Sequence, residues 1–391
     1  MRKRVAALVI FVNVFMLLVG STQTQSVTRS LLNRQKAVEL IKDNSSAIWD
    51  AEEGIKFAKK DYEEQAARSR SINTVKIFLF VNPYTDEDIY YYYDSAEQMQ
   101  MILMKEFFPE SMKFSYEVKQ KVAEVTENAM ANAADNLFVG LYSTYHSIGL
   151  AEKSLELAEK NLKREQKRFE NGMITELDLQ GALLEVRASE DAIVKAKRDY
   201  ENTHRQFNAM ANLPLSFRYD LIGTPWANEH EIPITQEQAI ASALENRMEI
   251  WSTMKQIELV ELRMEIYRHK KVYTFHQQTK KDYEAAQDEL DELIITLSQQ
   301  RYDIEKEIRQ AYQELKKCYN DLELAKLNLA KQENLLNTTK TQYESGIVPI
   351  SVIEQLEHAI EQLDFVVDIN LVNLLNKQDQ LYRAISAGPG Y

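Results

Sequence analysis

The sequence predicts a mainly α-helical protein, an elongated antiparallel coiled-coil rod built from two internal repeats, with at most one short β-hairpin. The first observation is a seam of apolar residues whose spacings alternate between four and three, a pattern typical of a coiled coil. A glycine turn ends this seam, and an earlier part of the chain repeats both features. The seam consists of Ile304, Ile308, Ala311, Leu315, Cys318, Leu322, Ala325, Leu329, Leu336 and Tyr343.

The turn after the seam has the residues that a helix end and a helix start require. Gly346 supplies the permissive backbone of a helix C-terminus, and Pro349 suits the first turn of the next helix. The final helix is predicted from Ile350 to about Ser386. A long helix and a return helix therefore form a hairpin around this glycine.

The repeat appears at two offsets. The stretch from Met130 to Phe169 reproduces the seam 174 residues earlier, and Gly172 stands where Gly346 stands later. A second match places Ala37 on Ala239, but at an offset of 202 residues. The first half thus holds 28 residues between the two matches that the second half lacks. These matches indicate an internal duplication, which predicts that the two halves share one architecture.

The repeats divide the chain into four parts. Residues 1–26 form an export segment, residues 27–213 the first helical repeat, residues 214–234 a linker and residues 235–391 the second repeat. The linker has three prolines and a glycine, and Thr235 with Gln238 forms a capping box at its end. The other predicted elements are a helix from Asn33 to about Arg68, a short helix Ala96–Phe108 ending at Pro109, a long helix Glu110–Asn171, a return helix Thr175–Asn212 and a break near Lys271–Phe275.

The first residues resemble a signal for export. Arg2, Lys3 and Arg4 precede an apolar run from Val5 to Gly20, which is shorter than the roughly 20 residues of a membrane-spanning helix. Because no clear cleavage site follows, an uncleaved N-terminal anchor is the alternative. The net charge of −13 argues against nucleic acid as a partner.

One passage, Thr74 to Tyr93, has the composition of a β-hairpin. β-Branched and aromatic residues flank the turn residues Asn82 and Pro83. The tyrosines form either an interfacial aromatic belt or a strand packed on helices. The candidate membrane-facing residues are Ile77, Phe78, Phe80, Tyr90, Tyr91, Tyr92 and Tyr93.

The chain resembles the TolC-like outer-membrane efflux proteins. The resemblance rests on the paired turns "RFENGMITELDLQ" and "QYESGIVPISVIEQ", on the Ala-rich long helices before them and on the helix openings with Ala37 and Ala239. It covers nearly all of residues 30–387. It implies a homotrimeric tunnel with a β-barrel through the outer membrane, working with a periplasmic adaptor protein and an inner-membrane transporter. No enzymatic activity and no cofactor are predicted from the sequence motifs.

By this resemblance the two glycine turns are tips that dock the adaptor. The predicted docking residues are Gly172, Met173, Ile174, Thr175, Gly346, Ile347, Val348 and Ser351. Exposed apolar residues at a turn favour a partner. The alternative is a local staple, in which each helix start packs its own apolar residues. Asp178 is a possible gate residue, but its counterpart Val352 is uncharged, so a gate closed by charge pairs is not predicted.

The hairpin region departs from the family pattern. A barrel of the family's size takes two strand pairs from each chain, and only one pair is predicted here, because the missing 28 residues fall where the second belongs. The predicted function is an exported outer-membrane or cell-envelope efflux component with a reduced barrel. The alternative is a barrel-less extracytoplasmic helical scaffold or spacer without channel activity.

Enzymatic and metal-binding motifs are not found. The sequence has no phosphate loop, and its six histidines are scattered. Glu354 and His358 are one helical turn apart and could bind a metal, although a solvated helical pair is the commoner arrangement. Cys318 lies on the seam and is interpreted as a core residue.

Overall fold

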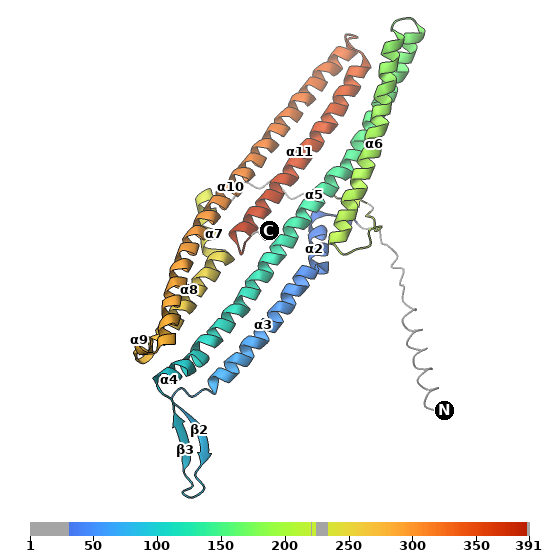
Figure 1. Ribbon diagram of the computed structural model, residues 1–391. Coiled ribbons are helices and arrows are strands. Elements are labelled where there is room, and N and C mark those ends of the chain that lie inside the picture. Colours follow the sequence, from blue (N-terminus) through green and yellow to red (C-terminus); the bar gives the residue numbers. More distant parts are fainter. Residues whose placement is uncertain (1–30, 220, 224–233, 389–391) are drawn as a thin grey trace, which may run out of the picture.

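The computed structural model describes residues 31–219, 221–223 and 234–388, which form an elongated rod of helices (Figure 1). The mainly α-helical fold class is confirmed. The predicted export segment, residues 1–26, and part of the predicted linker lie outside the described residues.

Both halves contain two medium helices, then a long helix, then a return helix. In the first half the elements are β1 (Leu31–Leu32), α2 (Arg34–Asn44), α3 (Ser46–Arg70), β2 (Lys76–Val81), β3 (Asp88–Tyr92), α4 (Ser95–Ile102), the π-helix η1 (Leu103–Phe107), α5 (Phe108–Glu170) and α6 (Glu176–Met210). They continue with β4 (Leu221–Ile222), α7 (Gln236–Asn246), α8 (Met248–Tyr267), the 3-10 helix η2 (His269–Lys271), α9 (Val272–Phe275), α10 (Gln277–Glu344) and α11 (Ile350–Ile385).

The two long helices set the length of the rod. α5 has 63 residues and α10 has 68, which correspond to about 95 and 100 Å at about 1.5 Å per residue. α6 and α11 pack along one part of these helices, and α3 and α8 pack along the other part (Figure 1). Both glycine turns lie at the same end of the rod, as predicted, and the hairpin β2–β3 projects from the opposite end (Figure 1).

Each long helix has an apolar core of its own. Ala37 of α2 and Ala239 of α7, which the repeat matches, are both fully buried, so each medium helix lies close to its long helix. The first core includes Ala37, Ile41, Ala134, Phe138, Leu141 and Phe207, and the second includes Ala239, Ala243, Ile304, Ile308, Leu315, Leu322, Leu374 and Leu381. The burial of Ile304, Ile308, Leu315 and Leu322 confirms the predicted seam.

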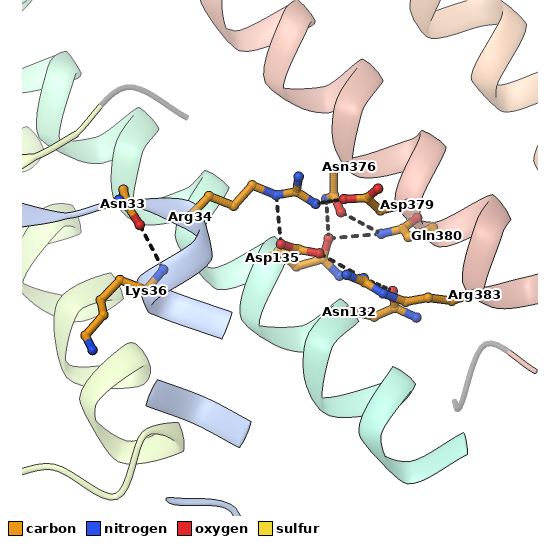
Figure 2. A network of polar contacts seen from close by, with 10 residues as sticks. Asn33, Arg34, Lys36, Asn132, Asp135, Asn376, Asp379, Gln380 and Arg383 are labelled. Carbon is orange, nitrogen blue, oxygen red and sulfur yellow. Dashed lines mark hydrogen bonds and ion pairs between the residues drawn. The ribbon is translucent and has the colours of Figure 1, made fainter. Parts of the chain in front are cut away.

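A polar network joins the two halves where α2, α5 and α11 meet (Figure 2). Asp135 of α5 is fully buried, and its Oδ1 and Oδ2 atoms accept hydrogen bonds from Arg34 Nε and Arg383 Nη1, each at 2.8 Å. Arg34 also pairs with Asp379, and Arg383 donates to Asn132 Oδ1 at 2.6 Å. The same α5–α11 contact carries the further polar pairs Asn136–Asn376, Tyr142–Asp368, Ser154–His358, Lys153–Glu361 and Arg164–Glu354.

The helix predicted from Asn33 to Arg68 is wrong in one respect, because it is broken at Ser45. Ser45 has extended backbone, and its side chain accepts a hydrogen bond from Ile48 N at 3.4 Å, so it caps α3. Asn33 caps α2 as predicted, with Oδ1 accepting from Lys36 N at 2.8 Å. A similar break at Arg247 separates α7 from α8. Neither break contains Gly or Pro, so the usual helix-ending residues do not mark them.

Pro109 does not end a helix, contrary to the prediction. The π-helix η1 leads from α4 into α5, and Pro109 lies in the first turn of α5. Phe108 N donates to Leu103 O, five residues earlier, so the wider π-helical turn lets the helical backbone continue through Pro109, which has no N–H to donate. The predicted break near Lys271 is confirmed, because Lys270 and Lys271 have φ values of 46° and 57° before α9.

A short parallel ladder that no sequence pattern predicts pairs β1 with β4. Leu31 lies opposite Leu221, and Leu32 opposite Ile222. Two residues are too few to show the alternation that identifies a strand. The ladder ties the start of the described chain to the segment that follows α6.

Candidate functional site

The first tip is built around Gly172, which has a φ of 68°. Gly172 N donates to Phe169 O, and Met173 N donates to Arg168 O, both at 2.8 Å. These two bonds satisfy the last carbonyls of α5 in a Schellman motif, which requires a left-handed residue at the glycine position. The chain then enters α6 at once, so Met173 stands at the end of the rod.

The second tip repeats this backbone geometry. Gly346 has a φ of 73°, Gly346 N donates to Tyr343 O at 2.8 Å and Ile347 N donates to Gln342 O at 2.9 Å. The entries into the return helices differ, because Thr175 caps α6 with its side chain whereas Pro349 begins α11 without a side-chain cap.

Exposure divides the predicted docking residues into two groups. Met173 and Ile347 are 68% and 72% exposed. Ile174 and Val348, each directly before a helix cap, are half-buried, as the local staple alternative expects. Of the remaining predicted residues, Gly172, Gly346 and Thr175 are exposed, and Ser351 is half-buried.

Sequence reasoning missed other exposed apolar residues at the tips. Phe169 and Tyr343, which the periodicity assigns to the seam, are 40% and 43% exposed. They lie one helical turn before Met173 and Ile347, so each tip presents an aromatic and an aliphatic side chain. Leu177 and Ile350 add to this surface. The sequence signal for Phe169 and Tyr343 was the 174-residue offset, which places the two aromatic residues at equivalent positions beside the two glycine turns.

Asp178, the possible gate residue, forms local hydrogen bonds. Its Oδ2 atom accepts from Thr175 Oγ1 at 2.7 Å and from Thr175 N at 2.9 Å, which completes the capping box of α6. These hydrogen bonds hold the pKa of the Asp178 carboxyl below its ordinary value. The Asp178 carboxylate therefore caps the N-terminus of its own helix, α6.

Alanine at Gly172 is expected to lower the free energy of unfolding by about 1–2 kcal/mol, because a Cβ atom disfavours the left-handed backbone. No atom lies within 4 Å of the added Cβ, so backbone strain is the whole effect. Gly181, in the middle of α6 and equally open, is the matched control. There alanine is expected to raise stability by about 0.5–1 kcal/mol. Urea unfolding followed by circular dichroism measures both, and equal effects would contradict the argument.

The predicted hairpin is present and projects from the helices. β2 pairs antiparallel with β3, with Ile77 opposite Tyr91 and Phe78 opposite Tyr90, and the register shifts between Phe78 and Phe80. Ile77, Phe78, Phe80, Tyr91 and Tyr92 are exposed, and Tyr90 and Tyr93 are half-buried.

Neither face of the hairpin is mainly polar. One face carries Phe78, Tyr90 and Tyr92, with the Lys76 ammonium 3.4 Å from the centre of the Tyr90 ring. The other face carries Ile77 and Tyr91.

The strands of the hairpin have 6 and 5 residues, whereas a tilted membrane-spanning strand takes about 9–11. Between α8 and α10 the described chain forms η2 and α9 and no strand. No helix in the described ranges is sufficiently long and apolar to cross a membrane.

The residues weighed as metal or thiol sites have other partners. Glu354 Oε2 accepts from Arg164 Nη1 at 2.6 Å, and His358 Nε2 lies 2.9 Å from Ser154 Oγ. Among the described residues no group of three or more His, Cys, Asp or Glu could hold a metal ion. Cys318 is half-buried against the second core, and burial raises the pKa of its thiol.

Acidification is expected to destabilise the protein through His146, which lies in the α5–α11 contact. Its ring is 4.4 Å from that of Tyr142 and 5.9 Å from that of Phe365, and burial lowers its pKa below the ordinary 6.5. The unfolded chain therefore binds this proton more readily, so the free energy of unfolding falls as the pH drops through 6.5. Urea unfolding at pH 7.5 and 5.5 should show a smaller difference for His146→Phe than for the wild type. The buried His204, whose pKa is also lowered, accounts for part of the remainder.

Comparison with known proteins identifies the fold. No protein-family model and no curated protein matches the sequence. The structure is similar to a membrane protein from Pseudomonas aeruginosa (12% identity, TM-score 0.64, 94% of each chain covered). It is also similar to the CmeC outer membrane channel of Campylobacter jejuni (14% identity, TM-score 0.63, 95% of this chain and 91% of that chain). A third similar structure is the open state of the MtrE outer membrane channel of Neisseria gonorrhoeae (12% identity, TM-score 0.57, 94% of each chain). The chain therefore has the fold of the TolC-like outer-membrane channels.

Proposed function

We propose that this protein is a non-enzymatic component of an export system in the cell envelope. Its long helices form part of the wall of a conduit, its tips bind a periplasmic adaptor protein, and an inner-membrane transporter supplies the cargo. The observation that carries the proposal is the emergence of both glycine tips at one end of the rod, each with an exposed aliphatic side chain. The fold shared with outer-membrane channels supports it.

The adaptor contact is tested by photo-crosslinking from the tips. A photoreactive amino acid at Met173 or Ile347 is expected to cross-link to a co-expressed adaptor encoded by a neighbouring gene. Trp49 of α3, which is also largely exposed but lies far from the tips, is the matched control position. Equal yields from Trp49 and from the tips would reject the docking assignment.

A conduit requires several copies side by side, and we propose a homotrimer. Inside the chain, α5 lies against α11. The 174-residue offset relates α5 to α10 and α6 to α11. The equivalent contact between two copies is therefore α10 of one copy against α6 of the next. Exposed apolar residues lie at the equivalent positions, Leu184 and Val194 on α6 and Leu324 and Leu327 on α10. Burying apolar surface between copies would stabilise the assembly.

The trimer is tested with cysteines at Leu184 and Leu327 in a Cys318→Ser background. A bifunctional maleimide is expected to link neighbouring copies into a closed set of three. The two single-cysteine variants are the controls, since neither places both groups at one contact. The same pattern of cross-linked species for the single-cysteine and double-cysteine variants on a denaturing gel would argue against the α6–α10 contact.

In this proposal the hairpin is the part of the chain that meets the outer membrane. Unpaired backbone groups are costly in lipid, so hairpins of neighbouring copies would have to pair edge to edge. Purified protein is then expected to give discrete conductance steps in a planar lipid bilayer. Deletion of residues 76–92 should abolish them, while a tip variant, Met173→Ser, should leave them unchanged.

A second candidate function is a helical spacer without channel activity. The specific observation in its favour is the hairpin, with strands of 6 and 5 residues and no polar face to line a water-filled lumen. The spacer predicts no conductance and no detergent requirement once the protein is exported, together with an intact cross-link from Met173 to the adaptor. Conductance that depends on residues 76–92 would exclude it.

A further inference from the structure

The residues that join α8 to α10 carry a concentrated positive charge. Residues 268–281 include five Lys and Arg side chains and no Asp or Glu, although the whole chain has a net charge of −13. The stretch covers η2, α9 and the start of α10, and all five basic side chains are exposed. We call these five residues the basic cap: Arg268, Lys270, Lys271, Lys280 and Lys281.

The basic cap lies at the same end of the rod as the hairpin β2–β3 (Figure 1). Lys270 Nζ donates to Gln98 Oε1 of α4 at 2.6 Å, and α4 follows directly after β3. The hairpin lies between α3 and α5 in the first half of the chain, and the basic cap lies between α8 and α10 in the second. The two halves therefore end in different elements, one apolar and one cationic.

Carboxylates neutralise little of this charge. Lys270 donates to a neutral amide, and Arg268 Nη2 donates to the neutral Tyr283 Oη at 2.8 Å. Lys280 has Glu284 at 3.8 Å, but both side chains are more than half exposed, so their attraction is weak. The other two lysines of the cap form no ion pair with any described residue. The cap is thus free to attract an anionic partner.

The backbone of the cap is held in a conformation that lysine does not favour. Lys270 has φ and ψ of 46° and 25°, and Lys271 has 57° and 29°. A Cβ atom disfavours such left-handed backbone, and glycine is the usual residue there. Lysine has no conformational advantage at either position, so what it adds is its charge. Strained backbone of this kind is concentrated at functional sites.

An acidic lipid surface has the chemistry that this cap fits. Clusters of roughly four to eight Lys and Arg residues beside a membrane-contacting segment bind acidic headgroups. Phe275 of α9 is 65% exposed within the cap, and aromatic rings are common at the membrane–water interface. The acidic remainder of the chain would be repelled by the same surface, so the rod would meet it end on.

The carboxylates of the hairpin region do not cancel the cap. Asp94 and Glu97 form the capping box of α4. Asp86, Glu87 and Asp88 lie at the far end of the hairpin, and the 6 residues of β2 separate them from its base by about 20 Å. This distance is more than twice the Debye length of about 8 Å at physiological salt, so the two groups of charges act separately.

We infer that the basic cap binds the phosphate groups of an acidic lipid surface beside the hairpin. The ammonium and guanidinium groups donate hydrogen bonds to phosphate oxygens, and the Phe275 ring lies among the headgroups. This inference rests on the proposed function, which places the hairpin end of the rod at the membrane.

Flotation of the full chain with preformed vesicles tests the basic cap. The wild type should bind phosphatidylcholine vesicles that contain phosphatidylglycerol more tightly than vesicles of phosphatidylcholine alone, and high salt should remove the difference. Lys270→Gln with Lys271→Gln should lower the partition coefficient for the acidic vesicles about 25-fold, at roughly fivefold for each charge. Binding by this double variant that equals wild-type binding would overturn the inference.

Matched variants separate the cap from net charge and from folding. Lys316→Gln with Lys317→Gln removes two adjacent exposed lysines from the middle of α10 and should leave vesicle binding nearly unchanged. Equal losses for the two glutamine pairs would refute a local site. Lys270→Arg with Lys271→Arg keeps the charge and should retain binding, whereas a loss in this variant would show that charge is not what binds.

Competitors distinguish the membrane from other sources of negative charge. Inorganic phosphate should weaken vesicle binding no more than sodium chloride of the same ionic strength. A specific loss in phosphate would assign the cap to the free ion and overturn the inference. Binding to polyglutamate without binding to acidic vesicles would assign the cap to an acidic protein, with the same consequence.

Conductance separates failure of the cap from failure of the export function. Conductance steps in neutral bilayers that need residues 76–92, together with equal binding to acidic and neutral vesicles, would support the export function and refute the cap. Binding to acidic vesicles that needs Lys270 and Lys271, without conductance, would support the cap and count against the channel.

Discussion

Arg247→Leu is expected to lower the free energy of unfolding by about 3–5 kcal/mol, because it removes a buried cation and leaves two carboxylates without it. The Arg247 side chain, between α7 and α8, is 2% exposed. Nε and Nη2 donate to Glu249 at 3.1 and 2.6 Å, and Nη1 and Nη2 donate to Glu307 of α10 at 2.9 and 3.2 Å. Nη1 also donates to Ala384 O at the end of α11, at 3.2 Å.

All five N–H groups of Arg247 are therefore used, and three helices depend on one side chain. Burial disfavours the charged guanidinium, but the two carboxylates hold its pKa above the ordinary value. Arg247→Lys keeps the charge without the planar fork, so an intermediate loss is expected. Arg309→Leu, whose exposed partner Glu305 lies one turn away on α10, is the control, with an expected change within about 0.5 kcal/mol. Urea unfolding at constant m-value measures all three, and equal losses for Arg247→Leu and Arg309→Leu would disprove the argument.

Asp135→Asn is the second large effect, with an expected loss of about 3 kcal/mol. The substitution keeps the shape of the side chain but leaves the Arg34 and Arg383 guanidinium groups, 19% and 18% exposed, around a neutral amide. In the wild-type protein, Arg34 and Arg383 both stabilise the Asp135 carboxylate, which is fully buried between them. Because the network joins α2, α5 and α11, the loss should loosen the contact between the two halves (Figure 2).

The matched control is Asp379→Asn, which removes the second partner of Arg34. Asp379 is 42% exposed, so water can replace its interaction and a loss below about 1 kcal/mol is expected. Hydrogen exchange gives the location of the effect, with amides of α2 and the last turns of α11 exchanging faster in Asp135→Asn. Unchanged exchange at both helices would show that the network does not hold the halves together.

The long-range plan of the fold could be predicted because its signals are periodic or repeated. Ile308 and Leu315 follow one helical seam, and Gly172 and Gly346 mark two turns that share one offset. Hydrophobic periodicity states which face of a helix is buried, and glycine states where the chain can reverse. Those two signals were enough to predict a rod with both tips at one end.

The polar networks could not be predicted, because their partners are distant in the sequence. Arg247 meets Glu307 across 60 residues, and Arg383 meets Asp135 across 248. In a helix with many charged residues, nothing in the local pattern separates a buried arginine from a solvated one.

At the tips, the sequence pattern could not predict which seam residues are exposed. Phe169 continues the periodic seam, but few side chains lie beyond the end of the helical pair to cover it, so the same pattern ends in an exposed ring.

The hairpin β2–β3 gives a single copy of the chain two open strand edges. Within the described part of the chain, β2 and β3 pair only with each other, so each outer edge presents backbone N–H and C=O groups beside the exposed Phe80 and Tyr92. Open edges with apolar side chains recruit other strands and lead to aggregation. We therefore expect a single copy of the chain to aggregate through residues 76–92 unless another strand covers these edges.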